Sequence, residues 1–248
     1  AGYKLLKSSV LDGMYLGDSP GNFGQISFYD AARGECYRDF GDPIGVASRV
    51  LIQGLFGILP DALNQQIILR PGFPDDWDKA SVSTPDISYR FTRKEDTDTY
   101  HITQRFQTPL HPVLQINARK EKIRSVKVNG VPATWQSIES AHGYPLLSIQ
   151  AEGTSSTTIT IEWEGASLHT LAVQELVIAS NGKLALQIPS GASISQVYDP
   201  QSVLAKHTVE ATAFNAQIKG EPGHHTFFVY THQGEMDWWQ PVNIYIEN

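Results

Sequence analysis

Carboxylates that could act as an acid and a base gather in a glycine-rich loop, residues 17–41 of the sequence. The acidic side chains of interest are Asp30, Glu35, Asp39 and, at the start of the next helix, Asp42, and they lie beside Arg33 and Arg38. Glycosidases hold two carboxylates roughly 5–10 Å apart across a sugar, one as acid and the other as base or nucleophile. The loop is therefore suited to one half of a sugar-cleaving site. The alternative is structural, with Asp42 capping the next helix and the other charges forming ion pairs within the loop.

Tryptophan rings are a second source of chemistry, because exposed rings stack on the faces of sugars. The chain has five of them, at positions 77, 135, 163, 238 and 239. Trp238 and Trp239, in the loop-like GEMDWWQP, form the best candidate platform, since one ring of an adjacent pair is expected to be exposed. The alternative for this pair is packing in a core or between domains, because a large ring stabilises mostly by burial. Trp163 alternates with Ile159 and Ile161 and is expected in a core.

Other signatures of chemistry are weak in this sequence. No G-x-x-x-x-G-K-[ST] or G-x-G-x-x-G motif occurs in the loop, so phosphate binding has no support. The histidines show neither H-x-H nor H-E-x-x-H spacing, and the neighbours His224 and His225 would point to opposite faces of a strand. We therefore expect no metal site and no cofactor. A Ser-His-Asp triad stays open, although no G-x-S-x-G elbow is present.

One or two helices are expected before residue 65. Residues 3–11 could be one end of a helix. The clearer helix is DPIGVASRVLIQGLFG, residues 42–57, where Asp42 suits the N-cap and Pro43 the first helical position. Its apolar stripe leaves few polar positions, so we expect this helix to be mostly buried, with a stop at Gly57 and at Pro60.

After residue 65 the hydrophobic period becomes two. Short alternating runs such as ISYRFTR, VLQINAR and STTITIEWEG follow one another at roughly ten-residue spacing, which is typical of antiparallel β-sandwiches. No crossover helix intervenes, so parallel sheets are not expected. The predicted fold is mainly β, an antiparallel sandwich preceded by one or two helices. We divide it into 1–65, 66–165 and 166–248, where the last two are two small sandwiches or one extended one.

Composition limits the class of partner. The chain has 248 residues and a net charge of −7, whereas a nucleic-acid-binding protein needs a clustered positive surface. No uninterrupted apolar run approaches the roughly 20 residues that span a bilayer. Cys36 is the single cysteine, which excludes an internal disulfide framework and a thiolate zinc site. The chain starts without a signal-peptide core, so we expect a mature form or a piece of a longer protein.

The order of motifs in one stretch of the chain is informative beyond its composition. Within residues 34–91 a last helix at 42–57 leads into GLFGILPD (54–61), then P-G-F-P (71–74) and DDWD (75–78), and a VNG…W pattern follows at 128–135. This order resembles the junction between catalytic barrel and trailing β-domain in six-hairpin, (α/α)6-barrel glycosidases. That superfamily includes α-L-rhamnosidase-like enzymes and many proteins of Bacteroidetes-type polysaccharide degradation.

The resemblance implies a C-terminal piece of a longer glycosidase-like protein, because a complete barrel has twelve helices and residues 1–65 have room for two at most. The loop with Glu35 and Asp39 would then face the sugar cleft. Glu35 is the implied acid or base of an incomplete site, and Arg38 and Asp39 would bind sugar hydroxyls. Asp76 and Trp77 would be structural.

The first functional hypothesis is therefore a C-terminal accessory region of a secreted or periplasmic glycoside hydrolase that acts on plant or host polysaccharide. Its partners would be carbohydrate and the missing N-terminal barrel region, with neither nucleic acid nor a membrane span. One alternative is a carbohydrate-binding module with Trp238 and Trp239 as its platform. Another is a purely structural brace, which predicts an exposed apolar surface where the helix with Leu51 and Leu55 has lost its neighbours.

Overall fold

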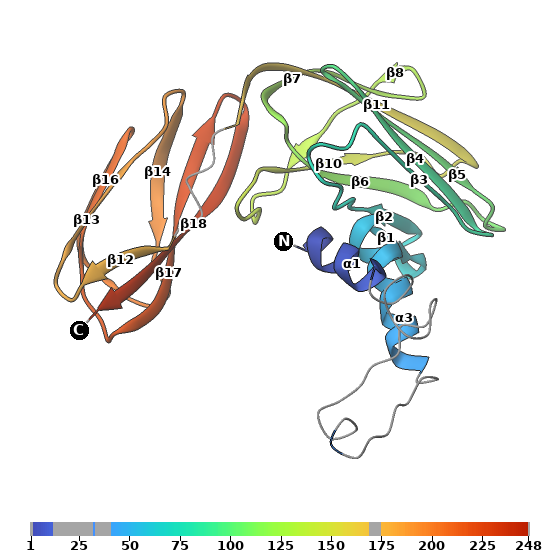
Figure 1. Cartoon of the computed structure of the whole chain (residues 1–248). Coiled ribbons are helices and arrows are strands. Elements are labelled where there is room, and N and C mark those ends of the chain that lie inside the picture. Colours follow the sequence, from blue (N-terminus) through green and yellow to red (C-terminus); the bar gives the residue numbers. More distant parts are fainter. Residues whose placement is uncertain (1, 12–31, 33–40, 169–174, 248) are drawn as a thin grey trace. The chain divides into compact units, whose positions relative to one another are not determined.

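The structure is a computed structural model that describes residues 2–11, 32, 41–168 and 175–247 of the chain. The described chain is mainly β, with four sheets and two short α-helices near the N-terminus (Figure 1). This confirms the predicted fold class. Contacts divide the chain into two compact units. The first consists of Ala1–Arg93, Tyr100–Leu114 and Ala151–Thr157, and the second of Lys94–Thr99, Gln115–Gln150 and Thr158–Asn248. Because this division cuts individual strands, the boundaries at 65 and 165 stay predictions.

The two helices form close to where the sequence predicts them. α1 runs over Gly2–Leu11, and α3 over Gly41–Arg49, where a π-helical turn, η2 (Val50–Leu55), continues it. Gly57 ends this segment with a φ of +66°, and a Cβ there would lie 1.9 Å from the Arg70 carbonyl oxygen, so only glycine fits.

The expectation of a mostly buried helix is wrong for the described part of this segment. Val46, Val50 and Leu51 are exposed by 59%, 42% and 40%. Only the last turn packs into a core, through Leu55 and Phe56. The physical reason is that the β-structure meets this helix at its C-terminal end, where Gly72 N–H donates to the Leu55 carbonyl. Its apolar stripe therefore extends beyond the surface that covers it.

The first two sheets, which we call the first sandwich, contain the strands between residues 58 and 167. One sheet has the order β1 (Ile58–Asp61), β2 (Gln66–Leu69), β6 (His111–Asn117), β10 (Leu146–Gln150), β9 (Gln136–Ser137), and a 3-10 turn (Ala62–Asn64) links β1 to β2. The other has the order β3 (Lys79–Ser83), β4 (Ile87–Lys94), β5 (Thr97–Gln104), β11 (Ser156–Ser167), β7 (Lys120–Val128), β8 (Val131–Pro132). Burial alternates along β4, β5 and β11 of one sheet and along β10 of the other, so each of the two sheets has one apolar face that is buried.

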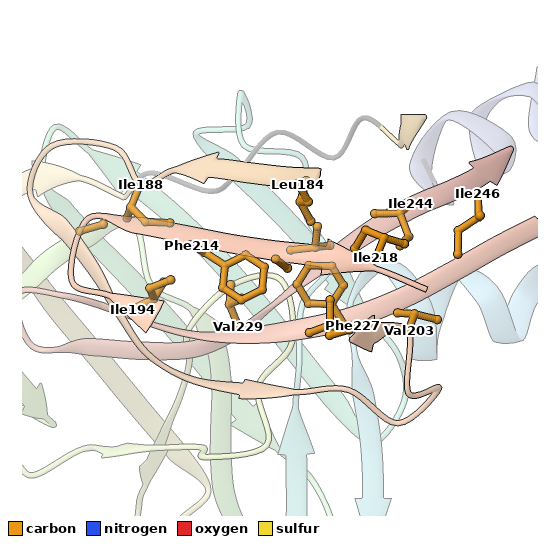
Figure 2. Close-up of a cluster of buried hydrophobic side chains, with 14 residues drawn as sticks. Leu184, Ile188, Ile194, Val203, Phe214, Ile218, Phe227, Val229, Ile244 and Ile246 are labelled. Carbon is orange, nitrogen blue, oxygen red and sulfur yellow. The ribbon is translucent and has the colours of Figure 1, made fainter. Parts of the chain in front are cut away.

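The other two sheets form the second sandwich. One has the order β12 (Leu176–Ala179), β18 (Met236–Glu247), β17 (Gly223–Gln233), β14 (Ala192–Tyr198), and the other has β13 (Lys183–Gln187), β16 (Ala213–Ile218), β15 (Leu204–Glu210). Side chains of both sheets share one buried cluster, mostly Ile, Leu and Val. Figure 2 shows Phe214 of β16 and Phe227 of β17 meeting in this cluster, with ring centroids 5.4 Å apart.

Most strand pairs are antiparallel, but two are parallel, which the sequence did not lead us to expect. β2 pairs with β6, and β12 pairs with β18. A crossover helix is not needed in the first case, because β3, β4 and β5 of the other sheet lie between β2 and β6 in the sequence. The tight turn predicted at Asn129-Gly130 is confirmed, with positive φ angles of 53° and 80° between β7 and β8.

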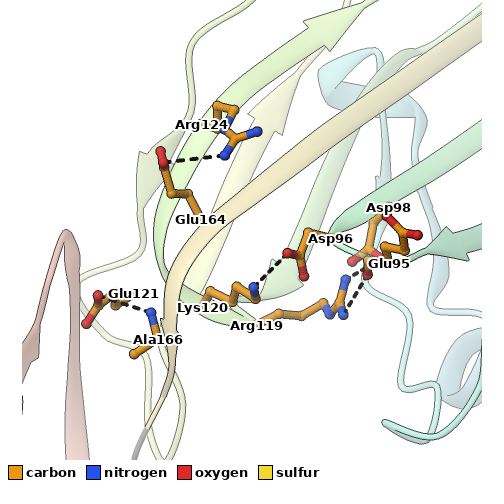
Figure 3. A network of polar contacts seen from close by, with 9 residues as sticks. All are labelled: Glu95, Asp96, Asp98, Arg119, Lys120, Glu121, Arg124, Glu164 and Ala166. Carbon is orange, nitrogen blue, oxygen red and sulfur yellow. Dashed lines mark hydrogen bonds and ion pairs between the residues drawn. The ribbon is translucent and has the colours of Figure 1, made fainter.

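Trp163 lies in the core, as its alternation predicts, and contacts a network of charged side chains, of which Figure 3 shows Asp98, Arg119, Asp96 and Lys120. The ring is 2% exposed, and its Nε1–H donates to Asp98 Oδ2 over 3.1 Å. Asp98 is itself buried and its Oδ1 accepts from Arg119 over 3.0 Å. In Figure 3 the Lys120 ammonium lies beside Asp96, 2.8 Å away. This hydrogen bond and the positive charge of Lys120 lower the pKa of Asp96.

Candidate functional site

The residues predicted for a sugar-cleaving site lie outside the described part of the chain. They are Glu35, Arg38 and Asp39 of the glycine-rich loop. Their roles therefore stay predictions. Helix α3 begins at Gly41, one residue before the predicted cap Asp42, whose side chain also lies outside the description.

The tryptophan pair of the predicted platform is divided between the two faces of β18. Burial alternates without a break along this strand, so neighbouring side chains point to opposite sides. Trp238 turns inward, where it is 1% exposed and its Nε1–H donates to Gln240 Oε1 over 3.2 Å. It is therefore no part of a surface platform. Trp239 lies on the outer face and is half-buried, so the predicted stacking role falls to this ring.

Trp239 belongs to a group of outward rings that we call the aromatic face: Tyr198, Phe228, Tyr230 and Trp239. The register explains the group, because Tyr230 is paired with Trp239 across β17 and β18, and Tyr198 with Phe228 across β14 and β17. The Tyr230 and Trp239 centroids are 4.9 Å apart, and those of Tyr198 and Phe228 are 6.1 Å apart. Tyr198 contacts Trp239 at 6.3 Å and closes the group. Tyr198 is 57% exposed, so the face is open to ligands.

The backbone of Trp239 is fixed on both sides. On one side it pairs with Tyr230 in the β17–β18 ladder. On the other, its N–H donates to the Ala141 carbonyl over 2.9 Å, and its carbonyl accepts from the Gly143 N–H over 2.8 Å. His142, between these two residues, places its ring 5.5 Å from Phe228. A ring held on a backbone that is paired on both edges keeps its position, which lowers the entropy cost of binding.

Tyr230 stays protonated next to an acidic end of this face. Its pKa is raised by burial, and then by the carboxylates of Asp237 and Glu139. The phenol therefore keeps its O–H at neutral pH and remains a hydrogen-bond donor. A sugar hydroxyl above the ring would find both an apolar surface and a donor.

A chain of hydrogen bonds lies at the end of the face beside Tyr230. Ser195 Oγ and His232 Nε2 are 2.6 Å apart, and His232 Nδ1 and Asp237 Oδ1 are 2.5 Å apart. The His232 ring meets the Tyr230 ring at right angles, with centroids 4.9 Å apart. Ser195 is exposed, and the side chains of His232 and Asp237 are exposed by 36% and 39%.

Other groups of polar side chains in the described chain are less organised. His224 Nδ1 lies 2.5 Å from Glu175 Oε1, whereas His225 Nε2 bonds the Glu221 carbonyl, so these neighbours bind separate partners. Within the described ranges no three His, Cys, Asp or Glu side chains gather closely enough to hold a metal ion. Nor does any described helix have the length and apolar character to cross a membrane.

Two parts of this site were not predicted from the sequence: the aromatic face and the contact of Ser195 with His232. Only the aromatic face has a recognisable pattern in the sequence. In HTFFVYTHQ (residues 225–233), rings at 228 and 230 occupy positions where an exposed strand face normally carries polar side chains. This pattern marks the aromatic face. The contact of Ser195 with His232 depends on the register of β14 and β17, which a spacing of 37 residues does not reveal.

Comparison with known proteins adds little to this geometry. No protein-family model and no curated protein matches the chain. Among solved structures, the tandem Ig repeats of Dlar align with 61% of this chain and 90% of theirs, at 11% identity and a TM-score of 0.20. A match with so low a TM-score supports no argument about this chain.

Proposed function

We propose that this chain is a C-terminal accessory region of a glycoside-hydrolase-like protein, and that it binds plant or host polysaccharide through the aromatic face. The resemblance of residues 34–91 to the barrel-to-sandwich junction of six-hairpin glycosidases supports the first part. The proposal assigns no complete glycosidase site to the purified chain. Turnover of aryl glycosides by this chain, abolished by Glu35→Gln, would contradict it.

The observation that supports the binding role is the cluster of four rings, Trp239 included, on one outer sheet face. Rings of this kind combine an apolar surface with polar edges, and they lose little conformational entropy when they are already packed. The apolar face of a pyranose ring matches such a surface, and its hydroxyls match the Tyr198 and Tyr230 O–H groups. Rings that remain partly in water stabilise a domain less than buried rings do, so their grouping on one outer face favours a ligand.

The test is the affinity of the purified chain for a panel of soluble plant and mucin-type polysaccharides, measured by affinity electrophoresis and by calorimetry. Trp239→Ala should weaken binding by roughly 1–3 kcal/mol, about 5- to 150-fold, if sugar stacking has the scale of base stacking on aromatic side chains. Tyr245→Ala is the matched control, because Tyr245 lies on the same face of β18, about 20 Å along the strand. Equal binding by both variants and the unaltered chain would remove the platform.

A structural brace is a second candidate, favoured by the exposed apolar side chains of α3 and η2. Val46, Val50 and Leu51 would lie against the missing barrel region. The purified chain should then self-associate at high concentration through this surface. Light scattering across a concentration series should show this, and Val50→Lys should reduce it. A monomer at all concentrations would argue against the brace.

A further inference from the structure

The hydrogen-bonded chain of Ser195, His232 and Asp237 has the connectivity of a nucleophilic triad. The serine oxygen meets one ring nitrogen of the histidine at 2.6 Å, and the aspartate meets the other at 2.5 Å. Both are hydrogen-bonded contacts short enough for proton transfer along the chain. Such triads are recognised by geometry and roles, since they occur on unrelated folds and in different chain orders.

The aspartate determines the direction of the hydrogen bonds. An ionised carboxylate only accepts, so His232 Nδ1 carries the proton that bonds Asp237. In the neutral ring, Nε2 is then the acceptor and receives the Ser195 O–H. This is the arrangement in which an imidazole acts as general base for a serine.

Strand geometry explains why the three side chains meet. His232 and Asp237 are directly paired across the β17–β18 hairpin, so they lie on the same face. On β14, Ile194 is paired with Thr231 and Gln196 with Tyr230, which leaves Ser195 as the extra residue of a β-bulge. Ile194 and Thr231 are buried, so both Ser195 and Gln196 lie on the outer side, the side of His232. Bulges of this kind re-aim a side chain and are frequent beside active sites.

The surroundings indicate the substrate. The nucleophile is exposed, so it can reach an ester on a large or polymeric molecule. The Tyr230 ring lies 4.9 Å from the His232 ring and 4.9 Å from the Trp239 ring, so the triad adjoins the aromatic face directly. A ligand stacked on Trp239 would present its substituents to Ser195.

We propose that Ser195, His232 and Asp237 hydrolyse acyl esters, such as acetyl groups carried by a sugar bound on the aromatic face. The identity of the sugar part rests on the proposed function, whereas the triad does not. Ser195 Oγ adds to the ester carbonyl carbon while its proton passes to His232 Nε2. The bond from carbon to the sugar oxygen then breaks, and His232 returns the proton to that oxygen. Water repeats both steps on the acyl-serine, which releases a carboxylic acid and restores Ser195.

Covalent labelling tests the nucleophile without any carbohydrate. An alkyl fluorophosphonate phosphonylates an activated serine and expels fluoride, and intact-mass spectrometry counts the adducts. We expect one adduct per chain on a peptide containing Ser195, and none in Ser195→Ala. Ser193→Ala is the matched control, because Ser193 lies on the same strand and is paired with His232. The Ser193→Ala variant should still form the adduct on Ser195. No adduct, or an adduct that survives in Ser195→Ala, would overturn the triad.

Turnover tests the complete reaction. The two substrates are acetylated xylan, which releases acetate, and nitrophenyl acetate, which releases nitrophenol. The rate of release from both should fall at least 100-fold in Ser195→Ala. Asp237→Asn should lower it by a similar factor, because this substitution disturbs the tautomer of His232. Ser193→Ala should match the unaltered chain. Failure of labelling together with intact polysaccharide binding removes the triad alone. Intact labelling together with absent polysaccharide binding removes the proposed sugar partner alone.

Discussion

The two sandwiches differ in where they group their large rings. The first sandwich packs a cluster of rings into its core, where Phe56, Tyr89, Phe91 and Tyr100 are each at most 7% exposed. Phe73 lies among them, 5.3 Å from Phe91 and 5.4 Å from Phe56. The second sandwich fills its shared core mainly with Ile, Leu and Val, and leaves the four rings of the aromatic face half-buried or exposed on an outer sheet face.

This difference separates rings that stabilise the fold from rings that remain available for a ligand. A buried ring contributes through the area it removes from water. Burial also raises the pKa of Tyr89 well above its ordinary value, and the nearby Tyr100 adds to this effect. The rings of the aromatic face bury less area, so they contribute less to folding. Stability measurements should therefore divide the aromatic residues into these two groups.

The largest expected effect is at Trp163 in the first sandwich. Trp163→Ala leaves a cavity and removes the Nε1–H donor from the buried carboxylate of Asp98. We expect a loss of about 3–5 kcal/mol in the free energy of unfolding, measured by urea titration. Trp163→Phe keeps most of the buried ring and loses the hydrogen bond, so it should cost about 1–3 kcal/mol. If Trp163→Ala cost no more than Trp163→Phe, the cavity would not be the main term.

The next effect is a contrast between neighbours in the second sandwich. Trp238→Ala should lower the free energy of unfolding by about 3–5 kcal/mol, because the ring is fully buried. Trp239→Ala removes a half-buried ring and its contacts with Tyr230 and Tyr198, and should cost only about 1 kcal/mol. The two variants differ by one position on β18, so composition and strand propensity are matched. Equal losses would show that Trp239 is a structural ring.

Local pattern was sufficient to predict the fold class. The change of period after residue 65 predicts strands, and the alternation of Trp163 with Ile159 and Ile161 predicts its burial. The same alternation decides between Trp238 and Trp239 once the strand is known, yet GEMDWWQP is loop-like as a sequence. The turn at Gly234, with a φ of +61°, lies just before this strand, so the start of the strand is not evident from the sequence.

Features that depend on register could not be predicted from one sequence. Ser195 reaches His232 through a bulge, and Tyr198 meets Phe228 through the pairing of β14 with β17. A slip of one residue would turn Ser195 away, and nothing local fixes that choice. The burial of α3 was predicted wrongly for a related reason, because its stripe extends beyond the surface that the described chain offers it.

The smallest effect concerns the exposed end of the Trp163 network and depends on pH. Lys120 lowers the pKa of Asp96, so the folded state binds this proton more weakly than the unfolded state. The contribution of the pair is therefore present above the ordinary pKa of an aspartate, about 3.9, and is lost as pH falls through the folded value. Lys120→Met should be slightly less stable than the unaltered chain at pH 7, and this difference should vanish in acid.

Lys183→Met is the control for this measurement, because it removes an exposed positive charge from β13 of the second sandwich. Any general effect of charge appears in both variants, whereas the effect of the ion pair appears only in Lys120→Met. Salt should reduce the difference at pH 7, since exposed pairs are screened. A difference between the variants that persists below the titration of Asp96 would arise from the packed stem of Lys120, which is 22% exposed, and not from its charge.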